Sequence, residues 1–253
     1  MKDRLVSLIY KSGQLSTAKT SKFSYFFCVA ILGMLAVLVG FAKTFIAPVS
    51  TGCFIAPGVV YIHGAFAFSW ISLFVIQTSL ISARKYRTHM AFGIAGILIA
   101  AGTAITMLPV GMYAANKELK QGLGETAISG IVGVVTSAIM FLGIVIAGVL
   151  NRHNPATHKR LMLLSTIVVL WPAWFRFRHY FPSVPRPDIW FAVVLADSLI
   201  VISCVWDKLV NGEIHPVFKY VGAFIILEHT FEVITFDSSS WRYVARQIYN
   251  LLS

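Results

Sequence analysis

The sequence predicts an all-α integral membrane protein, a bundle of seven transmembrane helices followed by a short interfacial C-terminal helix. Of the 253 residues, 57% are hydrophobic and only 12% are charged, whereas a soluble domain carries about 25% charged residues. The apolar residues also form runs near the roughly 20 residues that a membrane-spanning helix needs. Runs this long and uniformly apolar are not barrel strands, so the spans are predicted to be helices.

Seven such runs divide the chain. The first is longer than a signal-peptide core and lacks a small-x-small cleavage site, so we expect it to remain as an anchor. The fifth carries Pro172, which we expect to kink it near its end. The predicted spans are 23–47, 59–82, 89–112, 127–150, 160–178, 189–206 and 217–236. They form a transmembrane domain (23–236) between a basic segment (1–22) and a tail (237–253).

The tail has the pattern of an interfacial helix. Ser238 to Ser240 are favourable capping residues. A helix that begins there would lie in the outer interface of the membrane, with its aromatic residues at headgroup depth. The residues that would share its apolar face are Trp241, Val244, Ile248, Leu251 and Leu252.

The Lys and Arg residues predict the orientation. Thirteen of the 21 lie in the N-terminal segment or in loops on its side, seven lie on the opposite side, and Lys43 lies inside the first span. Cytoplasmic loops carry an excess of Lys and Arg, so the N-terminus is predicted inside and the C-terminus outside. The net charge of +11 thus comes from short loops rather than one basic face, which argues against a nucleic-acid partner.

Ionisable residues inside spans are costly in lipid and should face the bundle interior or a wet cavity. Glu228, His229 and Glu232 lie within five residues of the seventh span, on one broad helical face. Asp197 lies near the middle of the sixth span. The candidates for counter-charges, or for holding an anionic substrate, are the basic residues at the outer level: Lys43, Arg176, Arg178 and His179.

One interpretation of this layer is a metal centre. Imidazole and carboxylate ligands suit zinc or non-haem iron, and His63, His229 and Glu232 would supply them. Glu228, Glu232 and Asp197 would then be catalytic acids or bases. The second-helix histidine resembles that of zinc-dependent membrane hydrolases related to adiponectin receptors and ceramidases, but this chain lacks their His-x-x-x-His motif on the seventh helix.

A second interpretation is a b-type haem, because two histidines on facing helices at equal depth can ligate one. His89 and His158 open the third and fifth spans from the same side. A histidine after a basic loop is equally typical of an ordinary interfacial residue. A Soret band that disappears in His89→Ala or His63→Ala would establish haem.

A third interpretation is a proton- or ion-coupled small-solute transporter with a carboxylate relay through Asp197, Glu228 and Glu232. The same buried charges can also serve helix packing alone, as in a non-enzymatic subunit of a larger membrane complex. The partners predicted on these grounds are the lipid bilayer, a hydrophobic or anionic small molecule, and another copy of the chain or a membrane-complex subunit.

The polar residues between 59 and 216 resemble those of a group of uncharacterised bacterial membrane proteins. The shared pattern comprises His63, Gln77, His89-x-x-x-Gly93, His158-Lys159-Arg160-Leu161-Met162, Arg176, Asp207 and His215-Pro216. The resemblance implies a multi-pass protein of the bacterial inner membrane and no particular activity. We favour a His-centred polar site in the outer half that binds a metal or haem for redox or hydrolytic chemistry, with a transporter as the alternative; whether the protein is an enzyme stays open.

Overall fold

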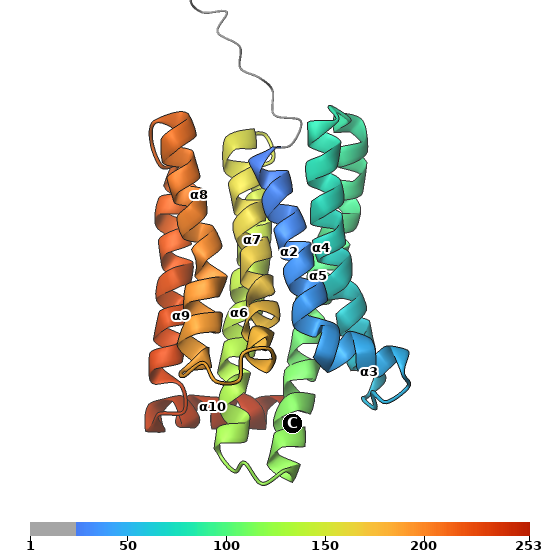
Figure 1. Ribbon diagram of the computed structural model, residues 1–253, viewed down its shortest axis with the longest axis vertical. Helices are drawn as coiled ribbons and strands as arrows, with labels where there is room; N and C mark the ends of the chain where they lie inside the picture. The colour runs from blue at the N-terminus through green and yellow to red at the C-terminus, as the bar shows by residue number, and fades with distance from the viewer. Residues whose placement is uncertain (1–23) are drawn as a thin grey trace, which may run out of the picture.

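The computed structural model describes residues 24–253, and every regular element in this part of the chain is helical (Figure 1). The all-α prediction is therefore confirmed for these residues. The predicted basic segment 1–22 lies outside them.

Six helices in the described part are long and apolar enough to cross a membrane, which indicates a multi-pass membrane protein. They cover the first six predicted spans, although the third is longer than the predicted 89–112. The six are α2 (Tyr25–Phe41) continued by η1 (Ala42–Ile46) and α3 (Ala47–Ser50), α4 (Gly58–Ser82), α5 (Tyr86–Lys120), α6 (Thr126–Leu150), α7 (Pro155–Phe175) continued by η2 (Arg176–His179), and η3 (Asp188–Leu195) continued by α8 (Ala196–Asn211).

The seventh predicted span is the segment formed by η4 (Val217–Gly222) and α9 (Ala223–Thr235). It carries Lys219, Glu228 and Glu232, and it is not among the six helices that qualify by length and composition. Six of the predicted spans are thus helices that could cross a membrane by length and composition, and a seventh crossing stays a prediction.

The lateral surface of the bundle is apolar. On α5, Ile94, Leu98 and Ile105 are each more than two-thirds exposed, at spacings that place them on one helical face. An exposed stripe of this kind is costly in water and favourable against acyl chains. The packing therefore indicates contact with lipid.

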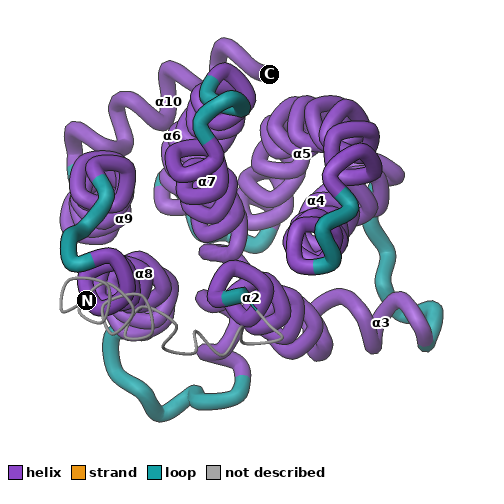
Figure 2. Tube along the Cα trace, turned by 90° about the horizontal axis from the view of Figure 1, so that it is seen from above, coloured by secondary structure: helices purple, strands orange, loops and turns teal. Residues whose placement is uncertain are grey.

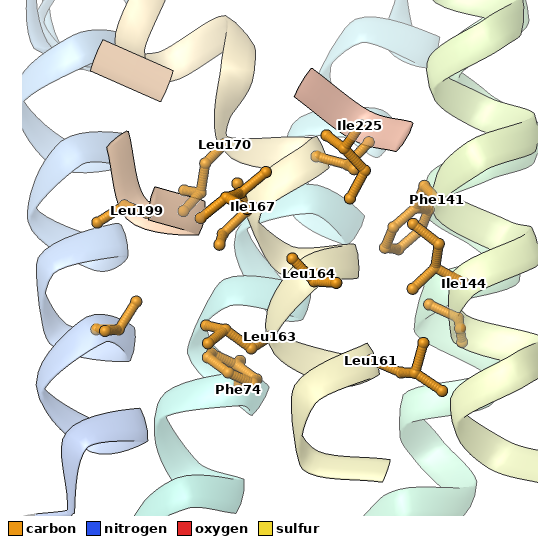
Figure 3. Close-up of a cluster of buried hydrophobic side chains, with 14 of the residues drawn as sticks. Phe74, Phe141, Ile144, Leu161, Leu163, Leu164, Ile167, Leu170, Leu199 and Ile225 are labelled. Atoms are coloured by element: carbon orange, nitrogen blue, oxygen red, sulfur yellow. The ribbon is translucent and has the colours of Figure 1, made fainter. Parts of the chain in front are cut away.

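Helix α7 occupies the middle of the bundle (Figure 2). Its side chains Leu163, Leu164, Ile167 and Leu170 are fully buried against the surrounding helices (Figure 3). This position explains why α7 carries more polar residues than a lipid-facing helix, since its surroundings are protein. Near Pro172, where a kink is predicted, the α-helix ends at Phe175 and the short 3₁₀ turn η2 follows it.

One end of the bundle is crossed by α10 (Ser239–Leu252), which lies roughly perpendicular to the other helices (Figure 1). The Ser238 side chain accepts a hydrogen bond from the backbone N–H of Trp241, as expected for a cap. Trp241 is buried and donates its indole N–H to the Ser129 carbonyl of α6. Of the predicted apolar face, Trp241 and Ile248 pack on the bundle, whereas the exposed residues are Val244, Leu251 and Leu252.

The opposite end is held by a buried ion pair between Arg160 of α7 and Asp207 of α8. Asp207 also accepts hydrogen bonds from the Asn211 amide at 2.7 Å and from the His215 backbone N–H at 3.0 Å. The carboxylate is thus fully enclosed by donors, which is what makes a buried charge tolerable. It ties α7, α8 and the loop before η4 together, and so fixes where α9 begins.

Candidate functional site

The most unusual polar group of the described bundle lies between α8 and α9. The Nδ1 atom of His229 is 2.8 Å from Oδ1 of Asp197, and the two side chains are 2% and 5% exposed. The short loop between Asn211 and Val217 places α8 and the η4–α9 segment side by side as antiparallel neighbours (Figure 1). Asp197 and His229, which are 32 positions apart in the sequence, thereby lie at the same height along the bundle.

Glu228 extends this pair. Its Oε2 atom lies 4.0 Å from Nε2 of His229. Three buried atoms of this group have no hydrogen-bond partner in the described protein: Asp197 Oδ2, Glu228 Oε2 and His229 Nε2. Buried polar atoms are nearly always satisfied in folded proteins, so a proton, water or small ligand is expected to complete the group.

Glu232 lies one turn further along α9, close enough to interact electrostatically with Glu228 and His229. Its carboxylate occupies the space above Gly133 of α6, where a methyl group would collide with it. Gly133 thus provides room for a carboxylate inside the bundle, in addition to the close helix packing that small residues permit. We call Asp197, Glu228, His229 and Glu232 the acid–histidine cluster.

The charge of this cluster is unbalanced. It contains three carboxyl groups and one imidazole, and no Lys or Arg of residues 24–253 forms an ion pair with it. Several ionised carboxylates in such surroundings are strongly disfavoured. The cluster therefore has to bind protons or a cation in order to adopt this arrangement.

The expected counter-charges lie elsewhere, which corrects the predicted pairing. Arg176 donates to the Thr44 hydroxyl and the Pro172 carbonyl, and Lys43 donates to the carbonyl of His179. These basic residues gather around η2, away from α9. Equal depth along the bundle did not mean contact, because α7 lies in the middle of the bundle with α9 on one of its sides (Figure 2).

The proposed metal ligands are also separated. The ring of His63 on α4 pairs through Nδ1 with the Thr106 hydroxyl of α5 at 2.9 Å, whereas His229 pairs with Asp197. Helices α4 and α9 lie on opposite sides of α6 and α7 (Figure 2). Among residues 24–253 no three His, Cys, Asp or Glu side chains are placed to hold a metal ion.

His89 and His158 do lie together, at the end of the bundle opposite α10. Their ring centroids are 6.4 Å apart and their planes nearly perpendicular. His158 Nδ1 lies 2.8 Å from the Gly148 carbonyl, and the Gln77 amide donates to the His89 carbonyl. The buried Nδ1 of His89 has no hydrogen-bond partner in the described chain. Haem ligation by this pair stays a prediction.

Two features of the structure were not predicted from the sequence. One is the burial of Arg160 against Asp207, for which an aspartate so close to the end of an apolar run was a signal. The other is the carboxylate above Gly133, since nothing local distinguishes this glycine from the neighbouring glycines of its helix.

No family model, curated protein or solved structure matches this chain. The resemblance based on the His, Gln and Arg motifs therefore brings no activity with it. The function has to be inferred from the geometry of the chain itself.

Proposed function

We propose that this protein is a proton-coupled transporter of a small solute, with the acid–histidine cluster as its proton site. The observation that carries the proposal is that each of three residues in contact has a buried atom without a hydrogen-bond partner among residues 24–253: Asp197 Oδ2, Glu228 Oε2 and His229 Nε2. Buried carboxylates and histidines of membrane helices are typical of proton relays.

The chemistry follows from the contacts. An ionised Asp197 only accepts hydrogen bonds, so Nδ1 of His229 carries a proton and donates it to Oδ1 at 2.8 Å. Nε2 is then the basic nitrogen that can take up a second proton. Glu228, at 4.0 Å from Nε2, is the nearest partner for exchange, and Glu232 continues the series by one helical turn toward α10.

This proposal includes a seventh membrane crossing by η4 and α9. Four large apolar residues of α9 are exposed at intervals of three or four residues: Phe224, Leu227, Phe231 and Ile234. This spacing forms one lipid-facing stripe, while Glu228 and His229 point away from it into the bundle. With Lys and Arg in excess at the other end, α10 lies on the outer side of a cell inner membrane, and the cluster takes its protons from that side.

Infrared difference spectra between acidic and alkaline pH test the proton site. The wild-type protein should show the C=O band of buried carboxylic acids, and Glu232→Gln should remove part of it. The half-exposed Glu125 at the start of α6 provides a matched control, and Glu125→Gln should leave the band unchanged. A spectrum without this band, or one that Glu232→Gln does not alter, would overturn the proton site.

Proteoliposomes that contain a pH-sensitive dye test the coupling. Mixtures of amino acids, sugars, carboxylates or nucleobases are added outside, and the internal pH is followed. At least one mixture should move protons with the wild type and not with Asp197→Asn. If no mixture moves protons, the cluster binds protons without transport and the proposed function is wrong.

A further inference from the structure

Arg176 is a largely buried cation with neutral partners. Its guanidinium donates to the Pro172 carbonyl at 2.8 Å and to the Thr44 hydroxyl at 3.2 Å, and it lies 4.1 Å from the ring centre of Phe41. No carboxylate of the described residues lies within ion-pair distance. A cation removed from water and left without a counter-ion is unfavourable, so an anion from outside the chain is expected here.

Two further cations surround Arg176. Lys43 donates to the His179 carbonyl and lies 4.1 Å from the ring centre of Tyr180. Arg178 donates to the Phe175 carbonyl and stacks on the same residue's ring. Their hydrogen-bond partners are again carbonyls, and both lie over aromatic rings. Glu118 lies close enough to Arg178 to interact electrostatically, but three cations against one carboxylate leave an excess of positive charge around η2.

A cavity of about 320 Å³ opens beside Arg176. Its remaining wall is formed by Val60 of α4, by the end of α5 beyond the predicted span, and by the residue that follows α5. The polar residues of this wall are Tyr113, Lys117, Glu118 and Gln121. A volume of this size lies at the lower end of small-ligand sites. The residues that line it include an arginine, a lysine, a glutamine and a tyrosine, all of which carry side-chain donors.

We propose that this cavity binds a phosphate group, with Arg176 and Lys117 as its cationic ligands. A guanidinium offers paired N–H donors that match phosphate oxygens, and a lysine adds a second charge. Glu118 in the same wall is outweighed by Lys117, Arg176 and Arg178, so the region stays positive. The site lies at the α10 end of the helices, at the level of the membrane interface. Free phosphate and a phospholipid headgroup present the same chemistry there.

The test measures binding of inorganic phosphate to the purified full-length protein by calorimetry. Arg176→Gln and Lys117→Gln should each weaken binding by about tenfold or more, because each removes a charge-assisted hydrogen bond. Lys120→Gln is the matched control, since Lys120 ends the same helix and does not line the cavity. Lys117→Gln also guards against misfolding, because its side chain lies at an exposed helix end.

A second measurement distinguishes the source of the phosphate group. The protein is reconstituted in phosphatidylcholine nanodiscs with or without phosphatidylglycerol, and retained lipid is counted by native mass spectrometry. Retention that Lys117→Gln abolishes, without binding of free phosphate, identifies a headgroup site. Binding of free phosphate with the same variant pattern identifies a soluble ligand. The proposal is overturned if neither binds, or if Lys120→Gln weakens binding as much as Lys117→Gln.

Discussion

At the scale of single residues, Gly133 and Glu232 depend on each other. The Glu232 carboxylate lies where the side chain of any other residue at position 133 would begin. A glutamate in the interior of a membrane bundle needs both space and a way to share its charge. Gly133 supplies the space, and Glu228 and His229 lie close enough to share the charge.

We expect Gly133→Ala to be less stable than Gly143→Ala by about 1 kcal/mol, at the low end of overpacking costs, because the new methyl group has to displace the end of the Glu232 side chain. Glu232→Ala in the same chain should restore much of this loss, because the methyl group then meets empty space. Thermal unfolding of the four proteins of this double-mutant cycle in detergent measures the coupling.

Gly143→Ala is the control for this cycle. Gly143 lies on the same helix, and a methyl group there would meet nothing within 4 Å. It should change stability little and show no coupling with Glu232→Ala. Additive effects of Gly133→Ala and Glu232→Ala would show that the collision does not determine the local structure.

At the scale of helices, α10 is attached to the bundle by a charged connection as well as by Trp241. Asp237 precedes α10 and accepts hydrogen bonds from the Arg242 guanidinium and from the hydroxyls of Ser129 and Thr126. Arg242, followed by these hydroxyls, holds the pKa of Asp237 well below its ordinary value.

The lowered pKa of Asp237 predicts how α10 docking responds to acid. The stabilisation is fully present above the unfolded pKa of about 3.9 and is lost as the pH falls through the lower folded pKa. Limited digestion with pepsin should therefore spare α10 at about pH 4 and release it in stronger acid. In Asp237→Asn the helix should be cleaved at both.

Another Asp–Arg pair provides the control for the pepsin experiment. Asp188, the first residue of η3, pairs with Arg186 in the preceding loop, and Asp188→Asn should leave the digestion of α10 as in the wild type. Equal resistance of Asp237→Asn and wild type at every pH would show that the Asp237 contacts do not hold α10.

The helices themselves were largely predictable, because each long apolar run has to satisfy its backbone internally in lipid. The position at which α5 ends was not predictable in this way. Beyond residue 112 the helix continues alongside α10: Ala115 belongs to one buried cluster with Trp241 and Ala245, and the Tyr249 hydroxyl donates to the Asn116 side chain. Sequence periodicity does not reveal a neighbour so distant in the chain. The Ser238 cap was predictable, because capping depends on residues within one turn.

At the scale of the whole molecule, the polar site shows what depth along a helix can and cannot predict. Depth and spacing grouped Glu228, His229 and Glu232 on one face of α9, and that grouping depends on one helix alone. Whether His63 or Arg176 meets them depends on the order of helices around α7, which hydropathy and charge counts do not contain. The contacts between neighbouring helices were therefore the part that needed the structure.

The same whole-molecule geometry predicts opposite sides of the membrane for the two ends of α9. In a variant whose native cysteines are replaced by serine, Glu213→Cys lies in the loop before η4 and Ser240→Cys lies at the start of α10. A membrane-impermeant maleimide should label residue 240 in intact cells and residue 213 only after permeabilisation. The proposed seventh crossing requires this result, because it places the exposed apolar stripe of α9 against lipid.

Two further positions calibrate the labelling of α9. Cys53, retained as the single cysteine in the loop between α3 and α4, should be labelled in intact cells, and a single His153→Cys in the cysteine-free background, in the loop before α7, only after permeabilisation. If residues 213 and 240 label on the same side while these two differ, η4 and α9 do not cross the membrane. The acid–histidine cluster would then lie on a segment that stays on one side of the membrane, and a transmembrane proton path through it would be impossible. If all four label in reverse, the crossing stands but the cluster takes its protons from the cytoplasm.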